Sequence, residues 1–202
     1  MNEKRAYTTM KRVFDLIASF LGLIILSPLM IVVIMMIKLL TPGPVFFSQA
    51  RIGRYGKPFM LYKFRTMKVN NGGNTVSVRG EDRITPLGAI LRRYKIDELP
   101  ELWNIFRGDM SFVGPRPDIA EYINILTGEE LRILELRPGL TSPASIKYVN
   151  EEELLASAPD PIKYYNAKIW PDKVRMNLEY CQERSFWGDI LLIIKTLFRT
   201  VK

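Results

Sequence analysis

The longest run of apolar positions lies near the N-terminus, over residues 16–37, and reads LIASFLGLIILSPLMIVVIMMI. It is long enough to cross a bilayer as a straight helix. Ser27 and Pro28 stand near its middle, and proline, which lacks a backbone donor, should bend a helix there. The Ser27 hydroxyl can bond a carbonyl that the bend frees. A straight transmembrane anchor and a helix that enters the membrane, bends and returns both fit this pattern.

Basic residues flank the apolar run on both sides and favour the re-entrant form. Basic flanks stay in the cytoplasm, so a straight span would send one flank outside, whereas a returning helix keeps both inside. The flanking residues are Lys4, Arg5, Lys11 and Arg12 before the run and Lys38, Arg51 and Arg54 after it. We therefore expect a re-entrant membrane helix over residues 1–40 and a cytoplasmic domain over residues 41–202.

The rest of the chain predicts short strands, turns and helices, as in a small domain. Residues 45–53 and 58–67 are rich in β-branched and aromatic positions and flank the turn-like RYGK, which predicts a β-hairpin. Residues 70–83 form a polar, glycine-containing stretch that predicts a loop, and Gly/Pro motifs predict tight turns at 108–118 and 137–143. Helices are predicted at about 87–94, 98–106 and 119–136, and others, interrupted at Pro161 and Pro171, toward the C-terminus.

The final segment, residues 185–202, carries apolar and aromatic residues on one helical face and basic residues elsewhere. Such a helix can lie in the membrane interface or pack on the core, and the sequence leaves both open. The predicted fold class is α+β, mainly helical. It comprises an N-terminal re-entrant helix hairpin, a β-hairpin and amphipathic interfacial helices around one small cytoplasmic domain.

The charge distribution points to anionic ligands. The net charge is +8, from 29 Lys and Arg against 21 Asp and Glu, and no acidic residue occurs between Asp15 and Glu81. That stretch should attract phosphates of lipids, nucleotides or nucleic acid, although a plain solvated basic surface would have the same composition. The single cysteine, Cys181, excludes an internal disulfide framework. Without histidine, proton transfer depends on other groups, and a metal would meet oxygen ligands, which favours Mg²⁺.

Two adjacent carboxylates, Asp97 and Glu98, stand in the stretch KIDELPELWNIFRGD. Pro100 is tolerated only in the first turn of a helix, so Asp97 is expected at or next to an N-cap, where it could be an ordinary cap. That position also attracts phosphate and keeps a carboxylate ionised. A Mg²⁺ shared with a phosphate would offset the repulsion between the two carboxylates. The motifs GxxxxGK[ST] and GxGxxG are missing from the sequence.

Several motifs together resemble the bacterial sugar transferases, in the small single-domain form of the monotopic phosphoglycosyl transferases. They are KRVFDLIAS…SP, PGPVFFSQARIG, YKFRTM, LRRYKIDELPELWNIFRGDMSFVGPRP and RPGLT, and they extend over nearly the whole chain. The resemblance implies transfer of a sugar-1-phosphate from a UDP-sugar to polyprenyl (undecaprenyl) phosphate, with release of UMP. This would be the first membrane step of glycan assembly, at the cytoplasmic face of a bacterial inner membrane, with membrane lipids but no nucleic acid as partners.

The resemblance also implies roles for individual residues. Asp97 is the nucleophile of a two-step reaction through an aspartyl-phosphosugar. Glu98 is its partner in proton transfer or, together with Asp97, in binding Mg²⁺. Arg92 and Arg116 match active-site positions where they would bind phosphate. The other predicted phosphate-binding residues are Lys63 and Arg65 of YKFRTM, Arg137 of RPGLT, and Lys147.

Lys147 is included because the chain departs from the family pattern around it. Many members continue RPG[IL]TG into a segment ending in NGR, whereas this chain reads RPGLTSPASIKYVNEEELL and lacks that arginine. Lys147 is the candidate replacement for its charge. Ser27 and Pro28 match the bend of the family's re-entrant helix.

Two other functions fit parts of the sequence. A non-enzymatic membrane-surface protein that binds anionic lipid or nucleic acid would explain the anchor and the basic stretch, but not the acidic pair. A glycosyltransferase that moves the sugar alone would release UDP rather than UMP. The sugar, the length of the carrier, the oligomeric state and the pathway are left open.

Overall fold

The computed structural model describes residues 2–69 and 83–200. The predicted loop at 70–83 therefore lies, except for its last residue, outside the described residues. The helices are α1 (Asn2–Leu40), α2 (Pro86–Arg93), α3 (Glu101–Arg107), α4 (Ala120–Ile123), α5 (Pro143–Lys147), α6 (Glu151–Ala156), α7 (Pro161–Tyr164), α8 (Trp170–Glu183) and α9 (Phe186–Thr200). The strands are β1 (Phe46–Ile52), β2 (Pro58–Phe64), β3 (Ser111–Val113) and β4 (Gly139–Thr141). The mainly helical α+β composition is confirmed.

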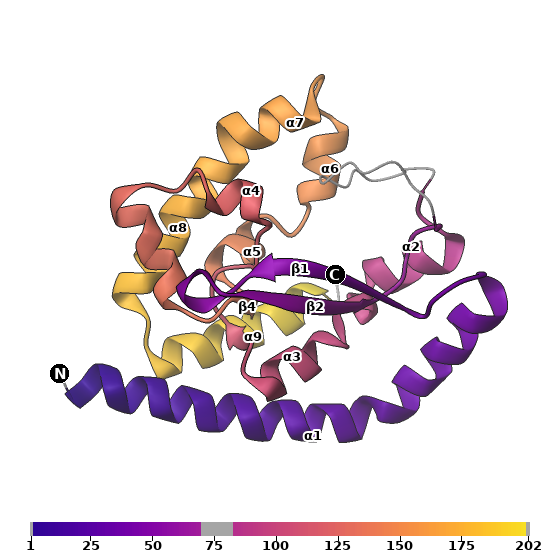
Figure 1. Cartoon of the computed structure of the whole chain (residues 1–202), viewed down its shortest axis with the longest axis horizontal. Helices are drawn as coiled ribbons and strands as arrows, with labels where there is room; N and C mark the ends of the chain where they lie inside the picture. Colours follow the sequence, from indigo (N-terminus) through magenta and orange to yellow (C-terminus); the bar gives the residue numbers. More distant parts are fainter. Residues whose placement is uncertain (1, 70–82, 201–202) are drawn as a thin grey trace.

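Helix α1 runs along the base of the molecule and bends upward toward its C-terminal end (Figure 1). It continues through Pro28 as one bent helix. The Ser27 hydroxyl donates a hydrogen bond to the carbonyl of Ile24 at 2.7 Å. That carbonyl would bond the N–H of residue 28 in a regular helix, so the serine satisfies the acceptor that proline leaves free, as the sequence predicts.

The apolar surface of α1 is mostly not used for packing. Within the described residues, its part Arg5–Leu40 is the one helix long and apolar enough to cross a membrane, and only 11% of its most apolar window is buried. A core helix of this length would be largely buried, so the exposure is consistent with membrane association. Val33 and Ile37, on the opposite face, are buried against β2 and α2.

The predicted β-hairpin is confirmed. Strands β1 and β2 pair antiparallel, from Phe46 opposite Phe64 to Ile52 opposite Pro58. Phe64 and Leu61 are buried, and they anchor two neighbouring apolar clusters, one shared with α1 and α2 and one with α3. The hairpin crosses the middle of the molecule, above α3 and α1 (Figure 1). Its inner face thereby supports the segment that carries the acidic pair.

A third apolar cluster surrounds α8 and includes Leu155, Tyr165 and Ile169. The single helix predicted for residues 119–136 is wrong. The structure has the short α4 and then a 3₁₀ segment, η3 (Gly128–Glu135). Thr127 forms a capping box with Glu130, and Gly128 has a φ of 52°, so a new helical segment starts there instead of continuing the first.

The final helix, α9, packs on the core, which is one of the two alternatives that the sequence leaves open, and its position relative to a membrane stays a prediction. One face contacts the core, where Asp189 is buried and Thr196 shares a hydrogen bond with Thr141. The other face exposes large apolar side chains, namely Trp187, Leu191, Ile194, Leu197 and Phe198. A helix of this kind suits the boundary between a protein surface and a membrane.

Candidate active site

Asp97 and Glu98 lie in a tight 3₁₀ turn, η2 (Ile96–Glu98), between α2 and α3. The prediction that Asp97 lies at or next to an N-cap is wrong, because the N-cap of α3 is Pro100. Backbone carbonyls bond the N–H groups of this turn. The N–H of Glu98 donates to the carbonyl of Lys95, and that of Leu99 donates to the carbonyl of Ile96. These bonds satisfy backbone donors that a side-chain cap would otherwise satisfy. Asp97 is therefore not an ordinary cap.

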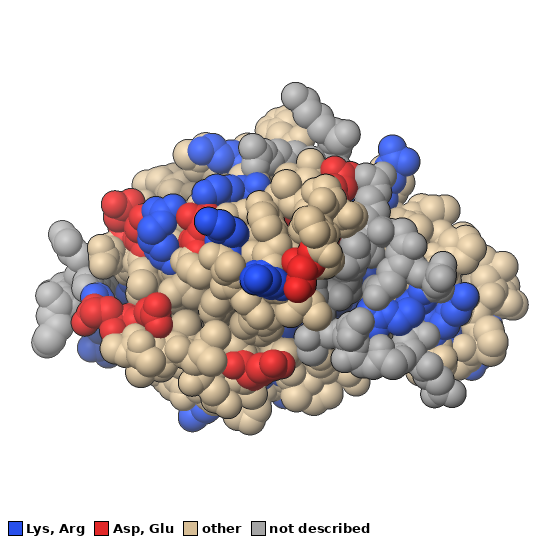
Figure 2. Space-filling model, turned by 90° about the horizontal axis from the view of Figure 1, so that it is seen from above, with Lys and Arg blue, Asp and Glu red and all other residues tan. Residues whose placement is uncertain are grey.

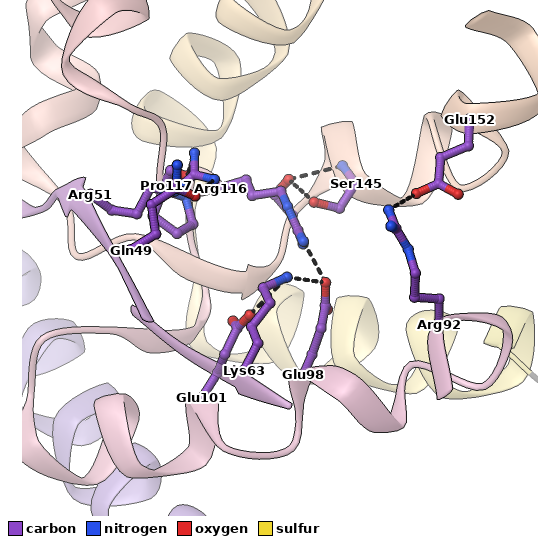
Figure 3. A network of polar contacts seen from close by, with 11 residues as sticks. Gln49, Arg51, Lys63, Arg92, Glu98, Glu101, Arg116, Pro117, Ser145 and Glu152 are labelled. Carbon is purple, nitrogen blue, oxygen red and sulfur yellow. Dashed lines mark hydrogen bonds and ion pairs between the residues drawn. The ribbon is translucent and has the colours of Figure 1, made fainter. Parts of the chain in front are cut away.

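Glu98 is the acidic centre of a cluster of charged side chains (Figure 3). Its Oε1 accepts hydrogen bonds from Lys63 Nζ at 2.8 Å and from the guanidinium of Arg116. Burial alone would raise the pKa of Glu98, but Arg116 and Lys63 hold it well below its usual range. Glu98 is consequently ionised at neutral pH.

Asp97 has the opposite environment. It is buried, and its Oδ1 has no hydrogen-bond partner among the residues that the structure describes. Burial and the adjacent Glu98 raise the pKa of Asp97, while Lys63, Lys95 and Arg92 oppose that rise. A buried acceptor without a partner costs free energy in the folded protein. Neighbouring carboxylates whose pKa values are pushed apart are typical of an active site.

Glu101 joins the cluster, although sequence reasoning overlooked it. It is 2% exposed, and its Oε1 lies 3.2 Å from Lys63 Nζ. Burial, opposed by Lys63 and reinforced by Glu98, raises the pKa of Glu101 to about 7. The available signal was its spacing from Glu98, since residues three apart share a helical face. Lys63 therefore lies between two carboxylates.

The loop that carries Arg116 is held by the RPGLT motif. Gly114 and Gly139 are in such close contact that a Cβ on Gly139 would lie 2.1 Å from Gly114 N. The N–H of Gly139 donates to the carbonyl of Pro115 at 2.8 Å, next to the parallel pairing of β3 with β4. This close backbone contact needs glycine, and it positions the Arg116 side chain over Glu98.

Arg92 lies at the edge of the cluster. It forms an ion pair with Glu152 of α6 and is near enough to Asp97 to lower the pKa of that carboxyl. Figure 3 shows its side chain directed away from Glu98 and toward Glu152. The segment that departs from the family pattern thus supplies the partner of a predicted active-site arginine.

Three other predicted phosphate-binding residues have partners elsewhere. The Arg65 guanidinium donates to the carbonyls of Thr41 and Pro42, which ties the hairpin to the end of α1. Arg137 Nε donates to the carbonyl of Gly108 at 2.8 Å, and Lys147 Nζ donates to Asp172 Oδ2 at 2.6 Å. The structure therefore does not bring Arg65, Arg137 and Lys147 into the Glu98 cluster. On the face seen in Figure 2, Lys and Arg side chains form separate groups, one of them interleaved with acidic residues.

Comparison with known proteins identifies the family. The family model described as "Bacterial sugar transferase" matches residues 6–202. The chain belongs to the bacterial sugar transferase family. This confirms the resemblance found in the sequence motifs, and it places the acidic cluster within a family of transferases.

Individual relatives match this sugar transferase over most of its length. A Bacillus subtilis protein named "Uncharacterized sugar transferase EpsL" is 35% identical over 93% of this chain and 85% of its own length. A Caulobacter vibrioides "UDP-glucose:undecaprenyl-phosphate glucose-1-phosphate transferase" is 36% identical over 93% and 68%, respectively. An Aeromonas hydrophila "UDP-N-acetylgalactosamine-undecaprenyl-phosphate N-acetylgalactosaminephosphotransferase" is 33% identical over 96% of this chain but 44% of its own length.

The donor set of this sugar transferase fits a hard cation only in part. Among the described residues there is no group of three or more carboxylate, His or Cys side chains that could hold a metal. Mg²⁺, however, is commonly bound by one or two carboxylates together with substrate phosphates and water. The unpartnered Oδ1 of Asp97, with Glu98 beside it, meets that smaller requirement. Glu98 already has two cationic partners, so Asp97 is the better ligand of the pair.

Proposed function

We propose that this protein transfers a sugar-1-phosphate from a UDP-sugar to undecaprenyl phosphate, forming undecaprenyl-diphosphate-sugar and releasing UMP. The observation that carries the proposal is the buried, unpartnered carboxylate of Asp97 beside the Glu98, Lys63 and Arg116 cluster. Family membership and the names of the Caulobacter and Aeromonas relatives support the reaction class. Those two names differ in the sugar, so the donor is proposed only as a UDP-sugar.

Asp97 acts as the nucleophile in this proposal. Its carboxylate oxygen attacks the β-phosphorus of the UDP-sugar, the bond from that phosphorus to the bridging oxygen breaks, and UMP leaves with that oxygen. An oxygen of undecaprenyl phosphate then attacks the aspartyl-phosphosugar and displaces Asp97. The raised pKa of Asp97 supports this role, because a carboxylate that the protein stabilises poorly is a stronger nucleophile once ionised.

The surrounding cations neutralise the substrate's phosphates. The Arg116 side chain is 41% exposed, whereas Glu98 is nearly buried. The guanidinium can therefore contact a diphosphate while Lys63 still balances the negative charge of Glu98. Arg92 can exchange Glu152, whose side chain is also 41% exposed, for a phosphate. Planar guanidinium groups suit phosphate oxygens through paired hydrogen bonds.

We further propose that Asp97, with Glu98 beside it, binds Mg²⁺ together with the diphosphate. When bound, the ion would polarise phosphoryl oxygens and offset their charge. The structural support for this site is the unpartnered Oδ1 of Asp97. A bound ion would give this buried oxygen a partner.

The proposed topology is a re-entrant α1 within residues 1–40 and a catalytic domain over residues 41–202, at the cytoplasmic face of the bacterial inner membrane. Basic residues on both flanks of the apolar run support it. The bend at Pro28, where the Ser27 hydroxyl donates to the carbonyl of Ile24, gives the helix a place to turn within the bilayer.

The deciding experiment measures UMP release by the purified full chain from a panel of UDP-sugars, with undecaprenyl phosphate and Mg²⁺. Release of UMP together with a lipid-linked diphosphate sugar is expected for at least one donor, and excess EDTA should stop it. UDP as the nucleotide product would indicate transfer of the sugar alone. No nucleotide product with any donor would favour a non-enzymatic protein that binds anionic lipid or nucleic acid.

A further inference from the structure

The loop that carries Arg116 depends on other segments for its shape. Residues 114–119 form neither helix nor strand, and Gly114, Pro115 and Pro117 are buried, whereas Arg116 is exposed. The two prolines have no backbone N–H, so the loop has few donors of its own. Hydrogen bonds from neighbouring segments must therefore hold it in place.

The first half of the loop is held by the RPGLT segment. The N–H of Gly114 donates to the carbonyl of Thr141 at 3.0 Å, together with the bond from Gly139 to Pro115. Both contacts lie before Arg116 in the sequence. They fix where the loop begins, but they leave the position of the residues after Arg116 open.

The second half of the loop is held by the end of β1. The N–H of Ile52 donates to the carbonyl of Asp118 at 3.0 Å, and Arg51 Nη1 donates to the carbonyl of Pro117 at 3.4 Å. Figure 3 shows Arg51 next to Pro117 and Arg116. Arg116 therefore lies between two anchored pairs of residues, and Arg51 is the side chain that helps to hold the second pair.

The guanidinium of Arg51 is oriented by Gln49, which lies two residues earlier on the same face of the strand. Arg51 Nη2 donates to Gln49 Oε1 at 2.7 Å. Within the described residues Arg51 forms no ion pair, and its buried Nε has no hydrogen-bond partner. Burial lowers the pKa of Arg51, while the nearby Asp118 opposes that change. A buried arginine that is incompletely paired costs stability, which is typical of functional positions.

One face of the hairpin reaches both cations around Glu98. In the register of β1 and β2, Arg51 lies opposite Phe59, which is four residues before Lys63. Cross-strand partners share a face, as do residues at even spacing along a strand, so Arg51 and Lys63 lie on the same face. Lys63 contacts Glu98 directly, and Arg51 contacts the loop that carries Arg116.

We propose that Arg51 is a positioning residue for Arg116. By holding Pro117 from β1, it keeps the Arg116 guanidinium over Glu98, where that group can bind the donor diphosphate. The effect on turnover rests on the proposed function, whereas the effect on the loop does not. Arg51 itself does not contact the substrate in this proposal, so its effect on turnover requires Arg116.

A double-mutant cycle in the kcat/KM of UMP release by the purified full chain tests this requirement. Arg51→Met keeps an apolar side chain but removes the charge and the donors. It should lower kcat/KM about tenfold, the factor expected for one hydrogen bond from a charged group. In the Arg116→Met background, the same replacement should change kcat/KM by less than about twofold. A tenfold loss in both backgrounds would show that Arg51 acts independently of Arg116, which would overturn the proposal.

Arg51→Lys separates position from charge. Lysine keeps the positive charge but lacks the planar fork that contacts Gln49 and Pro117 together, so this variant should lose nearly as much activity as Arg51→Met. Arg175→Met is the matched control and should keep full activity, because Arg175 forms its ion pairs within its own helix, α8. Full activity of Arg51→Lys or of Arg51→Met would overturn the proposal.

Hydrogen exchange tests the loop without turnover. Measured by mass spectrometry, peptides that cover residues 114–119 should exchange their amide hydrogens about tenfold faster in Arg51→Met than in the parent protein, because the loop loses an anchor. Arg175→Met should leave this exchange unchanged. Faster exchange in a protein that releases no UMP would support the positioning role while contradicting the proposed function. Unchanged exchange in a folded Arg51→Met protein would overturn the positioning role, whatever the activity.

Discussion

At the scale of single residues, Asp97 and Glu98 are adjacent in the chain but differ in what neutralises them. Glu98 has both Lys63 and Arg116 on one carboxylate oxygen. Asp97 keeps a buried oxygen that no described residue bonds. This asymmetry assigns different tasks to the pair. In the proposed mechanism, Glu98 organises cations that can contact phosphate, and Asp97 supplies the attacking oxygen.

Replacement of Asp97 by Asn separates chemistry from folding. The amide has nearly the same shape but cannot attack phosphorus usefully, so we expect UMP release to fall by at least about a thousandfold. Because the replacement removes a buried carboxylate without a partner, the melting temperature should be unchanged or higher. Asp160→Asn, at the exposed N-cap of α7, is the control and should keep full activity. Near-normal turnover by a folded Asp97→Asn protein would contradict the nucleophile assignment.

Glu101 should make stability depend on pH. Its pKa is raised from 4.5 to about 7, so the folded state prefers the protonated form. Its burial therefore destabilises the protein progressively as the pH rises from about 4.5 to 7, and the penalty remains above that range. We therefore expect Glu101→Gln to raise the melting temperature of the protein more at pH 8 than at pH 5. Parallel curves for the two proteins would show that Glu101 does not titrate in this window.

At the scale of elements, two loops far apart in sequence build one side of the site. The GPRP loop after β3 lies against the RPGLT segment that leads into β4, through the contact of Gly114 with Gly139. This pairing gives RPGLT a structural role. Its arginine bonds the C-terminal end of α3 through Gly108, and its glycine admits the neighbouring backbone.

Gly139→Ala should therefore act on Arg116 from a distance. Its Cβ would meet backbone atoms of Gly114 at 2.1 Å, and backbone cannot give way as a flexible side chain can. We expect the free energy of unfolding to fall by about 1–3 kcal/mol. The rate of UMP release should fall by a larger factor than the amount of folded protein in the membrane. Gly188→Ala is the control, since among the described residues its Cβ would meet only the Ser185 side chain, at 2.9 Å. Equal activity of the two variants would contradict the positioning of Arg116 by this contact.

The topology of α1 can be tested by labelling single cysteines. Cys181 is buried and is replaced by Ala first, and cysteine is then placed at Thr8 or at Ser48. If α1 returns to its own side of the membrane, both positions should react with an impermeant maleimide from the same side of sealed vesicles. Labelling from opposite sides would show a straight span.

Local pattern predicted the elements better than it predicted the site. The hairpin at RYGK and the helix of α2 follow from alternation and from turn residues, which are local signals. The N-cap assignment of Asp97 failed because the 3₁₀ turn before Pro100 depends on how α2 meets α3. The position of Glu101 beside Lys63 depends on contacts between segments that are distant in the sequence. The same is true of the hydrogen bonds from Arg65 to Thr41 and Pro42. No local sequence pattern encodes such contacts.

At the scale of the whole molecule, the acidic turn is held close to the membrane helix. Helix α3, which follows the turn, packs on α1, where Leu102 lies against Gly22. Arg12 of α1 donates to the carbonyls of Ile105 and Phe106 at 2.7 and 2.8 Å, at the far end of α3. Both ends of α3 are thereby tied to α1, which fixes the position of the Asp97 cluster relative to this helix.

The proposed mechanism requires the two substrates to react one after the other at Asp97, and that order can be measured. Enzyme given a reactive UDP-sugar without undecaprenyl phosphate should release about one equivalent of UMP and then stop, because Asp97 holds the phosphosugar until an acceptor arrives. The intact protein should gain the mass of the sugar phosphate, and peptide mapping should place it on Asp97. Added undecaprenyl phosphate should remove the mass and yield the lipid product. Asp97→Asn should show neither the burst nor the added mass. If UMP appears only when undecaprenyl phosphate is present, and no mass is gained, the phosphoryl group passes directly between the substrates and Asp97 has another role.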